Sequence, residues 1–116
     1  MEHLKNLNIV ITAGASGIGS AMAIELSKHG SCVTICDKDS SALDSFSKNN
    51  PKIDCHNVDV SEEQQIKKFF NEIEKKVGNI NALINNAGFQ VHQQNLKILV
   101  SKIGKRLLIQ ILMEFF

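Results

Sequence analysis

Residues 7–19 read LNIVITAGASGIG, and this stretch decides the fold. Leu7 to Thr12 is an apolar run rich in Val and Ile that ends in a Gly/Ala/Ser turn, which is typical of a buried strand. Apolar positions then recur at helical spacing from Ile18 to His29, and Gly30 stands just past them as a C-cap. The stretch therefore predicts a strand, a glycine-rich turn and a helix, in that order.

The same alternation of strands and helices continues as far as residue 88. Further strands are expected at residues 31–36, 53–58 and 82–84, and further helices at residues 40–48 and 61–77. We expect Ser61 to begin the last helix, with Glu62 and Glu63 in its first turn, where carboxylates suit the helix dipole. Short strand–helix connections imply parallel strands joined by right-handed βαβ units. The predicted fold class is α/β: the first half of a Rossmann-type doubly wound parallel sheet, with strand order 3-2-1-4.

The character of the chain changes after Gly88. Residues 89–116 hold four basic residues against one acidic residue, and their apolar positions from Leu96 to Phe115 fall on one helical face. We therefore expect a half-domain over residues 1–88 and a divergent tail over residues 89–116 that forms a C-terminal amphipathic helix. Because no strand is expected beyond residues 82–84, that strand would keep an open apolar edge, which invites association unless the tail covers it.

The composition excludes disordered and fibrous proteins. The chain has 116 residues, 43% of them hydrophobic and 22% charged, which indicates one ordinary globular domain. A formal net charge of +1 gives no field that gathers nucleic acid. Three cysteines without a CxxC pair, four scattered histidines and no apolar leader favour a cytoplasmic protein with free thiols and no metal site. The simplest expectation for the histidines is surface or turn positions: His3, His29, His56 and His92.

The glycine-rich turn over residues 12–19 has the features of a phosphate site. Glycines allow the backbone to approach a phosphate closely, while the free N–H groups at the start of a helix point at the anion. Gly19 is expected on the inner side of the helix, where a missing side chain lets the helix pack closely on the strand. The alternative is a glycine-rich turn that binds nothing.

Polar residues end the other strands at the same edge of the predicted sheet. Asp37 closes the second strand, 18 residues after Gly19, where a carboxylate can accept hydrogen bonds from a ribose diol. The alternative is a plain turn residue, which is the expectation for Asp39. Asp59-Val60 ends the third strand and Asn85-Asn86-Ala87-Gly88 ends the fourth. Ligands of doubly wound sheets bind at this carboxyl edge, so the four features together predict one site.

These motifs, in this order, resemble the short-chain dehydrogenase/reductase family over residues 4–88. The family fingerprint is TGxxxGxG, an acidic strand end, an Asp-Val pair and NNAG. The resemblance implies an oxidoreductase fold that binds an adenine dinucleotide. It implies that Gly14, Ser16, Gly17, Ile18 and Gly19 surround the pyrophosphate and adenosine, that Asp37 holds the ribose hydroxyls, and that Asp59 and Val60 contact the adenine ring. Asn86, Ala87 and Gly88 would lie at the sheet end beside the ribose.

One residue departs from the fingerprint, because Ala13 stands where the family has its first glycine. If this position needs a positive φ, alanine costs about 1 kcal/mol there. Gly14, next in the chain, could absorb the strain.

The residues at the end of the second strand also bear on the choice of cofactor. A carboxylate at Asp37 would repel a 2′-phosphate, which favours NAD(H) over NADP(H). Lys38 is the counterargument, since a cation one residue further on could pair with that phosphate.

The catalytic segment of the family has no counterpart in this chain. The resemblance implies a Tyr-x-x-x-Lys helix, and the sequence contains no tyrosine. Ser101 and Lys105 repeat the spacing, but an aliphatic hydroxyl is a much weaker acid than a phenol. We therefore expect no catalytic residue and a chain that is inactive alone, as a truncated or frame-shifted product of a longer reductase gene would be.

Two alternatives remain open at this stage. The chain could be a non-catalytic dinucleotide-binding module that associates with itself or docks on a full-length relative through the open sheet edge or the tail. The basic and apolar tail could also lie on a membrane surface. The simpler expectation is a helix that buries its apolar face on the sheet.

Overall fold

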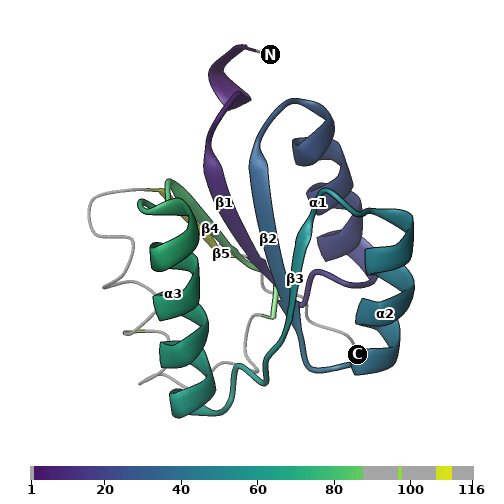
Figure 1. Cartoon of the computed structure of the whole chain (residues 1–116), viewed down its shortest axis with the longest axis vertical. Coiled ribbons are helices and arrows are strands. Elements are labelled where there is room, and N and C mark those ends of the chain that lie inside the picture. The colour runs from purple at the N-terminus through teal and green to yellow at the C-terminus, as the bar shows by residue number, and fades with distance from the viewer. Residues whose placement is uncertain (1, 88–96, 98–106, 111–116) are drawn as a thin grey trace.

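Five parallel strands form one sheet with the order β3-β2-β1-β4-β5, and helices lie on both of its faces (Figure 1). The structure, a computed structural model, describes residues 2–87, 97 and 107–110. After a short 3-10 helix at Glu2–Leu4, the elements are β1 (Asn8–Thr12), α1 (Gly17–Lys28), β2 (Cys32–Asp37), α2 (Ser40–Asn49), β3 (Asp54–Asn57), α3 (Glu63–Val77), β4 (Ala82–Asn85) and β5 (Leu107–Gln110). The predicted α/β class and the strand order 3-2-1-4 are confirmed.

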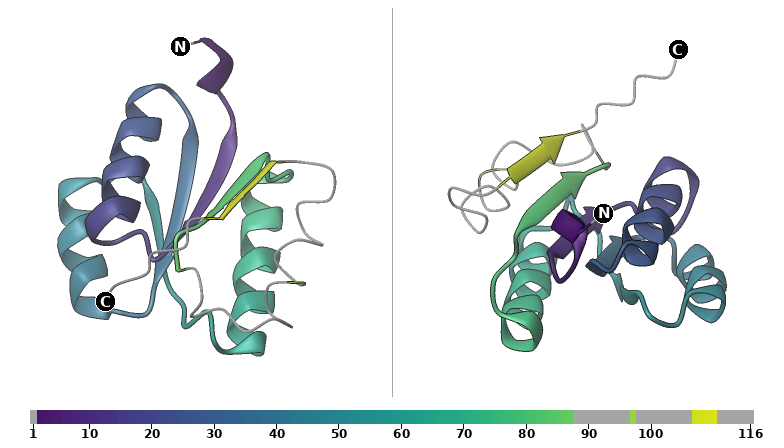
Figure 2. Two further views of the ribbon diagram at one scale, coloured as in Figure 1. Left: turned by 180° about the vertical axis from the view of Figure 1, so that it is seen from behind. Right: turned by 90° about the horizontal axis from the view of Figure 1, so that it is seen from above.

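The sheet is the middle layer of three, with α3 on one face and α1 and α2 on the other (Figure 2). Alternate residues of β1 point to opposite faces: Val10 packs in the cluster with α3, whereas Ile9 and Ile11 pack in the cluster with α1 and α2. Strands buried on both faces read as nearly continuous apolar runs, which is why residues 9–11 carried such a clear signal. The helix residues of the two clusters are Ile66, Phe69, Phe70 and Ile73 of α3, Ala23 of α1, and Leu43 and Phe46 of α2.

The helix ends follow the expected chemistry with one exception. Gly30 has a φ of +92° just after α1, and Gly78 ends α3 with a φ of +80°. The exception is Ser61, which does not begin α3: the helix starts at Glu63 with Glu62 as its N-cap. The Ser61 hydroxyl instead donates to Oδ1 of Asp59 at 2.6 Å, so it is held in the turn before the helix.

The tail contains a strand where a helix was predicted. Residues 107–110 form β5, which pairs in parallel with β4 in the register Ala82↔Leu107 to Asn85↔Gln110. A short apolar run is compatible with a buried strand as well as with a helix face, so spacing alone misled the prediction. The open edge of β4 offers unpaired backbone groups, and β5 satisfies them. The predicted open edge at β4 is therefore also wrong.

The rest of the predicted tail helix lies outside the described residues, apart from Lys97, which is helical. The longest described helix is α3, with 15 residues, and a helix needs about 20 apolar residues to span a bilayer. Nothing among the helices at residues 2–87 and 97 is long and apolar enough to cross a membrane.

Candidate functional site

The parallel strands end at one edge of the sheet (Figure 1). A cavity of about 270 Å³ opens at this carboxyl edge. Four of the predicted site residues line it: Ser16, Asp37, Val60 and Ala87. Its remaining walls come from Ala13, Lys38, Asp39 and Val58. No motif in the sequence marked Val58 as a site residue, although its place at the end of the third predicted strand puts it on this edge.

The turn that forms the floor of the site contains two left-handed residues, Ala13 with a φ of +53° and Gly17 with a φ of +57°. Ala13, which replaces a glycine of the family pattern, therefore adopts the left-handed conformation that favours glycine. Gly14 does not have a positive φ, so it does not take over that conformation. A Cβ added at Gly17 would meet nothing within 4 Å, which leaves the backbone there open to a ligand.

Gly14 and Gly19 lack side chains for a different reason, which is close packing. A Cβ on Gly14 would lie 2.6 Å from Cβ of Ile35, and a Cβ on Gly19 would lie 2.4 Å from the carbonyl oxygen of Ala13. The expected position of Gly19 on the inner side of α1 is confirmed, since the residue is buried against the turn. Gly14 therefore lets the turn lie against β2, and Gly19 lets α1 lie against the turn.

Hydrogen bonds from both neighbouring strand ends hold the turn in place. The N–H of Gly14 donates to the carbonyl of Cys36 at 3.1 Å, and the N–H of Ala15 donates to Oδ2 of Asp37 at 3.2 Å. From the other side, Nδ2 of Asn86 donates to the carbonyl of Ala13 at 3.0 Å. The turn is therefore fixed between β2 and the residues that follow β4.

Asp37 carries the charge of the site at the end of β2. Its second oxygen accepts the N–H of Asp39 at 3.0 Å, so each oxygen already has one backbone donor. An ionised carboxylate has about four acceptor positions, which leaves capacity for a ligand diol. Asp39 has the structural role expected of it: Oδ1 accepts the N–H of Ala42 at 3.1 Å and caps α2.

Asp59 does not line the cavity, although Val58 and Val60 on either side of it do. Its Oδ1 accepts the N–H of Ser61 at 2.9 Å, and its own N–H donates to the side chain of Gln65 at 2.8 Å. Asp59 thus holds the connection from β3 to α3 in place. This connection carries the two valines that line the cavity.

The end of β4 is held by a residue pair that the sequence did not single out. Oγ1 of Thr12 donates to Oδ1 of Asn85 at 2.9 Å and accepts the N–H of Ala87 at 3.0 Å. Both side chains are fully buried, and Nδ2 of Asn85 has no partner among the described residues. This network places Ala87 on the cavity wall, whereas Gly88 lies outside the described residues.

The remaining predicted site residues, Gly14, Gly17, Ile18, Gly19 and Asn86, surround the turn without lining the cavity. Ile18 is 46% exposed in the first turn of α1, an unusual position for a large apolar side chain. Ser101 and Lys105 lie outside the described residues.

The cysteines of β2 differ in their exposure to solvent. Burial raises the pKa of the Cys36 thiol from 9.0 to about 12, so the thiol stays neutral beneath the turn, as expected of a small buried hydrophobe. Cys32 was expected in the same buried strand but is exposed. Within residues 2–87, 97 and 107–110, no group of three or more His, Cys, Asp or Glu side chains could hold a metal ion.

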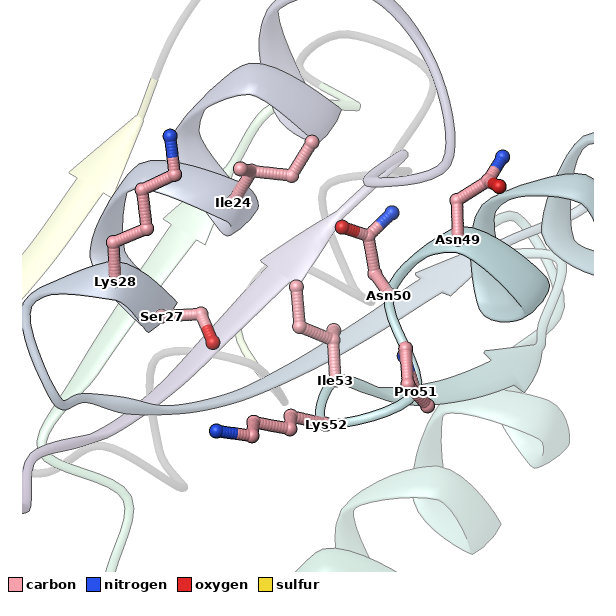
Figure 3. A pocket seen from close by; sticks show the side chains of 8 residues that line it. All are labelled: Ile24, Ser27, Lys28, Asn49, Asn50, Pro51, Lys52 and Ile53. Atoms are coloured by element: carbon pink, nitrogen blue, oxygen red, sulfur yellow. The ribbon is translucent and has the colours of Figure 1, made fainter.

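Two other cavities lie away from the predicted residues. One of about 370 Å³ is formed by the end of α1 and the connection from α2 to β3, with Lys28 and Lys52 at its rim and Ile24 and Ile53 inside (Figure 3). Another of about 450 Å³ lies between β3 and α3 and includes His56. His56 is not a simple surface residue, because its side chain is only 22% exposed and is paired with carboxylates.

Comparison with known proteins places the chain in a family. The profile of the family described as short chain dehydrogenase matches residues 7–111, and so continues past Gly88. An uncharacterised oxidoreductase of Bacillus subtilis is 38% identical over 92 residues, which are 76% of this chain and 34% of that protein. A meso-2,3-butanediol dehydrogenase of Serratia marcescens is 36% identical over 89 residues, which are 74% of this chain and 35% of that protein.

The solved structures agree with the sequences. The crystal structure of a short chain dehydrogenase from Bacillus anthracis superposes with a TM-score of 0.68 at 31% identity, covering 73% of this chain and 36% of that one. The chain thus spans about a third of the length of the relatives it matches. The order of the strands, the glycine turn at the carboxyl edge and these matches lead to one conclusion: the chain belongs to the short-chain dehydrogenase family.

Proposed function

We propose that this chain binds the adenosine and pyrophosphate part of a nicotinamide adenine dinucleotide in the cavity at the carboxyl edge. The proposal rests on one observation: apolar side chains and a carboxylate line the same cavity, and the backbone of Gly17 nearby has no side chain to block a ligand. Val58, Val60 and Ala87 supply the apolar wall, and Asp37 supplies the carboxylate.

Each part of the cavity suits one part of the ligand. The apolar wall accepts the face of the adenine base, and the free acceptor positions of Asp37 accept the ribose hydroxyls. The first N–H groups of α1, which have no partner within the helix, face the pyrophosphate across Gly17. When bound, the nicotinamide ring would take up or supply a hydride.

The residues around Asp37 support NAD(H) in preference to NADP(H). The carboxylate is held at the strand end by the N–H groups of Ala15 and Asp39, so it cannot easily turn away from a 2′-phosphate. A like charge close to that phosphate is unfavourable in a partly buried site. Lys38 lines the same cavity but sits on a flexible stem, and its attraction offsets only part of this repulsion.

We further propose that the chain does not transfer hydride unaided. The proton-handling phenol of the family has no equivalent, because the sequence contains no tyrosine. The described residues bind and orient the dinucleotide, while the alcohol or carbonyl chemistry of the family needs groups that residues 2–87 do not supply.

The proposal is tested by calorimetry of the full chain with NAD⁺, NADH and NADP⁺. We expect both forms of NAD to bind and NADP⁺ to bind more weakly. The variant Asp37→Asn removes the charge and one strong acceptor, and should weaken NAD⁺ binding by about tenfold while NADP⁺ binding improves. The matched control is Asp44→Asn, which removes an exposed carboxylate of α2 and should change neither affinity.

Two results would contradict the proposal in different ways. Tighter binding of NADP⁺ than of NAD⁺ by the unaltered chain would reverse the cofactor preference. Absence of binding by all three dinucleotides would overturn the proposed function.

A further inference from the structure

We infer that Ala13 is a recognition residue for the adenine base, and that its methyl group contributes affinity at the expense of backbone strain. The inference rests on the proposed function, since it concerns the same cavity. It goes beyond it by giving a role to the one residue that departs from the glycine pattern.

The strain at Ala13 follows from its backbone conformation. Its φ of +53° lies in the left-handed region, which an L-residue with a Cβ occupies at a cost. Within the described part of the chain, Asn6 is the one other non-glycine residue with a positive φ, and asparagine tolerates this region better than alanine. A strained conformation persists only where the surrounding structure over-determines it.

The surroundings of Ala13 meet that condition. Its carbonyl accepts Nδ2 of Asn86 at 3.0 Å. The next N–H, that of Gly14, donates to the Cys36 carbonyl at 3.1 Å. A glycine would keep all of these backbone contacts without strain, so the methyl group is the only thing that alanine adds.

The packing of Ala13 shows where that methyl group acts. Ala13 packs against the core cluster that contains Val58, Val60 and Ala87, and all four residues line the cavity. These four apolar residues share the lining of the cavity with the polar residues Ser16, Asp37, Lys38 and Asp39. A flat heteroaromatic base attached to a polar ribose matches this division, with the base on the apolar wall and the ribose on the carboxylate.

The test compares Ala13→Gly with the unaltered chain, using ADP and inorganic pyrophosphate as separate probes. ADP places a base against the wall, whereas pyrophosphate meets only the turn. Loss of one methyl from the wall should weaken ADP binding by about fourfold and leave pyrophosphate binding unchanged. Relief of strain should raise the melting temperature by about 2–6 °C.

The matched control is Asn6→Gly, which replaces the other left-handed residue. Asn6 lies before β1, where its N–H donates to the carbonyl of Gly30, and not at the carboxyl edge. This variant should leave the affinity for ADP unchanged, which separates an effect at the cavity from a general effect of a new glycine.

The outcomes distinguish this inference from the proposed function. If the unaltered chain binds neither ADP nor NAD⁺, the proposed function itself fails. If the chain binds ADP but Ala13→Gly binds it equally well or better, the inference on Ala13 is wrong and the proposed function stands. If Ala13→Gly weakened the binding of ADP and of pyrophosphate equally, the cause would be a looser turn, and recognition of the base by Ala13 would be wrong. If its melting temperature were lower than that of the unaltered chain, the inference of strain at Ala13 would be wrong.

Discussion

Nε2 of His56 lies 2.9 Å from Oδ2 of Asp54 on the edge strand β3. The other ring nitrogen, Nδ1, lies 3.5 Å from Oε2 of Glu72 on α3, and Lys76 of the same helix reaches Asp54 at 3.2 Å. This charged cluster joins the edge strand to the helix that covers it, beside the larger cavity between them. None of these four residues lines the cavity at the carboxyl edge, so we expect the cluster to contribute to stability.

The cluster predicts a specific dependence of stability on acid. Burial alone would raise the pKa of the Asp54 carboxyl, but hydrogen bonds and charge from His56 and Lys76 outweigh it and lower the pKa below 3.8. A carboxyl whose pKa is lower in the folded state contributes stability above the unfolded pKa, and loses it as the pH falls through the folded pKa. Asp54→Asn should therefore be less stable than the unaltered chain above pH 3.8, and the difference should vanish in stronger acid.

Urea denaturation between about pH 2 and pH 7 measures this difference. Because about a third of the Asp54 side chain is exposed to solvent, screening keeps its contribution to about 0.5 kcal/mol or less. Asp44→Asn, on an exposed part of α2, is the control and should leave the shape of the pH curve unchanged. A difference for Asp54→Asn that grows in acid would contradict the assignment.

The close packing around Gly19 leads to a second prediction, on the effect of adding a side chain there. In Gly19→Ala the new Cβ would lie 2.4 Å from the carbonyl oxygen of Ala13 and 2.6 Å from Nδ2 of Asn86, so the turn must shift. Overpacking of this kind costs about 1–3 kcal/mol. Because the shifted groups belong to the cavity floor, NAD⁺ binding should be lost together with stability, as measured by urea denaturation and calorimetry.

Gly17→Ala is the matched comparison in the same turn. Its Cβ would meet nothing within 4 Å, so its cost comes from the φ of +57° and amounts to about 1 kcal/mol. If Gly17→Ala proved more destabilising than Gly19→Ala, the packing role of Gly19 would be wrong.

The buried hydrogen bonds of the Thr12 hydroxyl lead to a third prediction, on stability. Thr12→Val keeps the shape but leaves Oδ1 of Asn85 and the N–H of Ala87 without their partner in a buried site. An unpaired buried polar group costs about 1–3 kcal/mol, so this variant should unfold at clearly lower urea concentration. Thr12→Ser retains the hydroxyl and should recover most of the loss, and equal destabilisation by both variants would point to the methyl group instead.

The part of the fold that the sequence predicted well is the part with redundant signals. The strand at residues 9–11 is apolar on both faces, and Gly30 marks the end of α1 with a positive φ that only glycine adopts freely. Strand order then followed from the handedness of βαβ units, which leaves few alternatives. Asp37 and Ser16 reached the cavity because residues at strand ends and helix starts have fixed places in such a sheet.

The misses have physical causes as well. Residues 107–110 were assigned to a helix because an apolar run of that length has no period of its own, and the decisive fact is the pairing partner, β4. Asp59 does not line the cavity, and its Oδ1 instead accepts two hydrogen bonds from Ser61, a local contact that spacing does not reveal. The sequence showed that Ala13 replaces a glycine but could not show whether the position needs a positive φ, which the structure shows that it does.

The pairing of β5 with β4 predicts an unequal response to two neighbouring prolines. In a strand, the N–H groups of successive residues point to opposite sides, so only one of Leu108 and Ile109 donates to β4. Leu108→Pro and Ile109→Pro should therefore differ, with one losing a ladder hydrogen bond and the other directing its missing N–H away from the sheet. In a helix both N–H groups would be bonded, and either proline would cost about 3 kcal/mol. Hydrogen exchange of the β4 amides, from Ala82 to Asn85, reports the result: faster exchange in one variant only supports the strand, whereas equal effects would restore the helix.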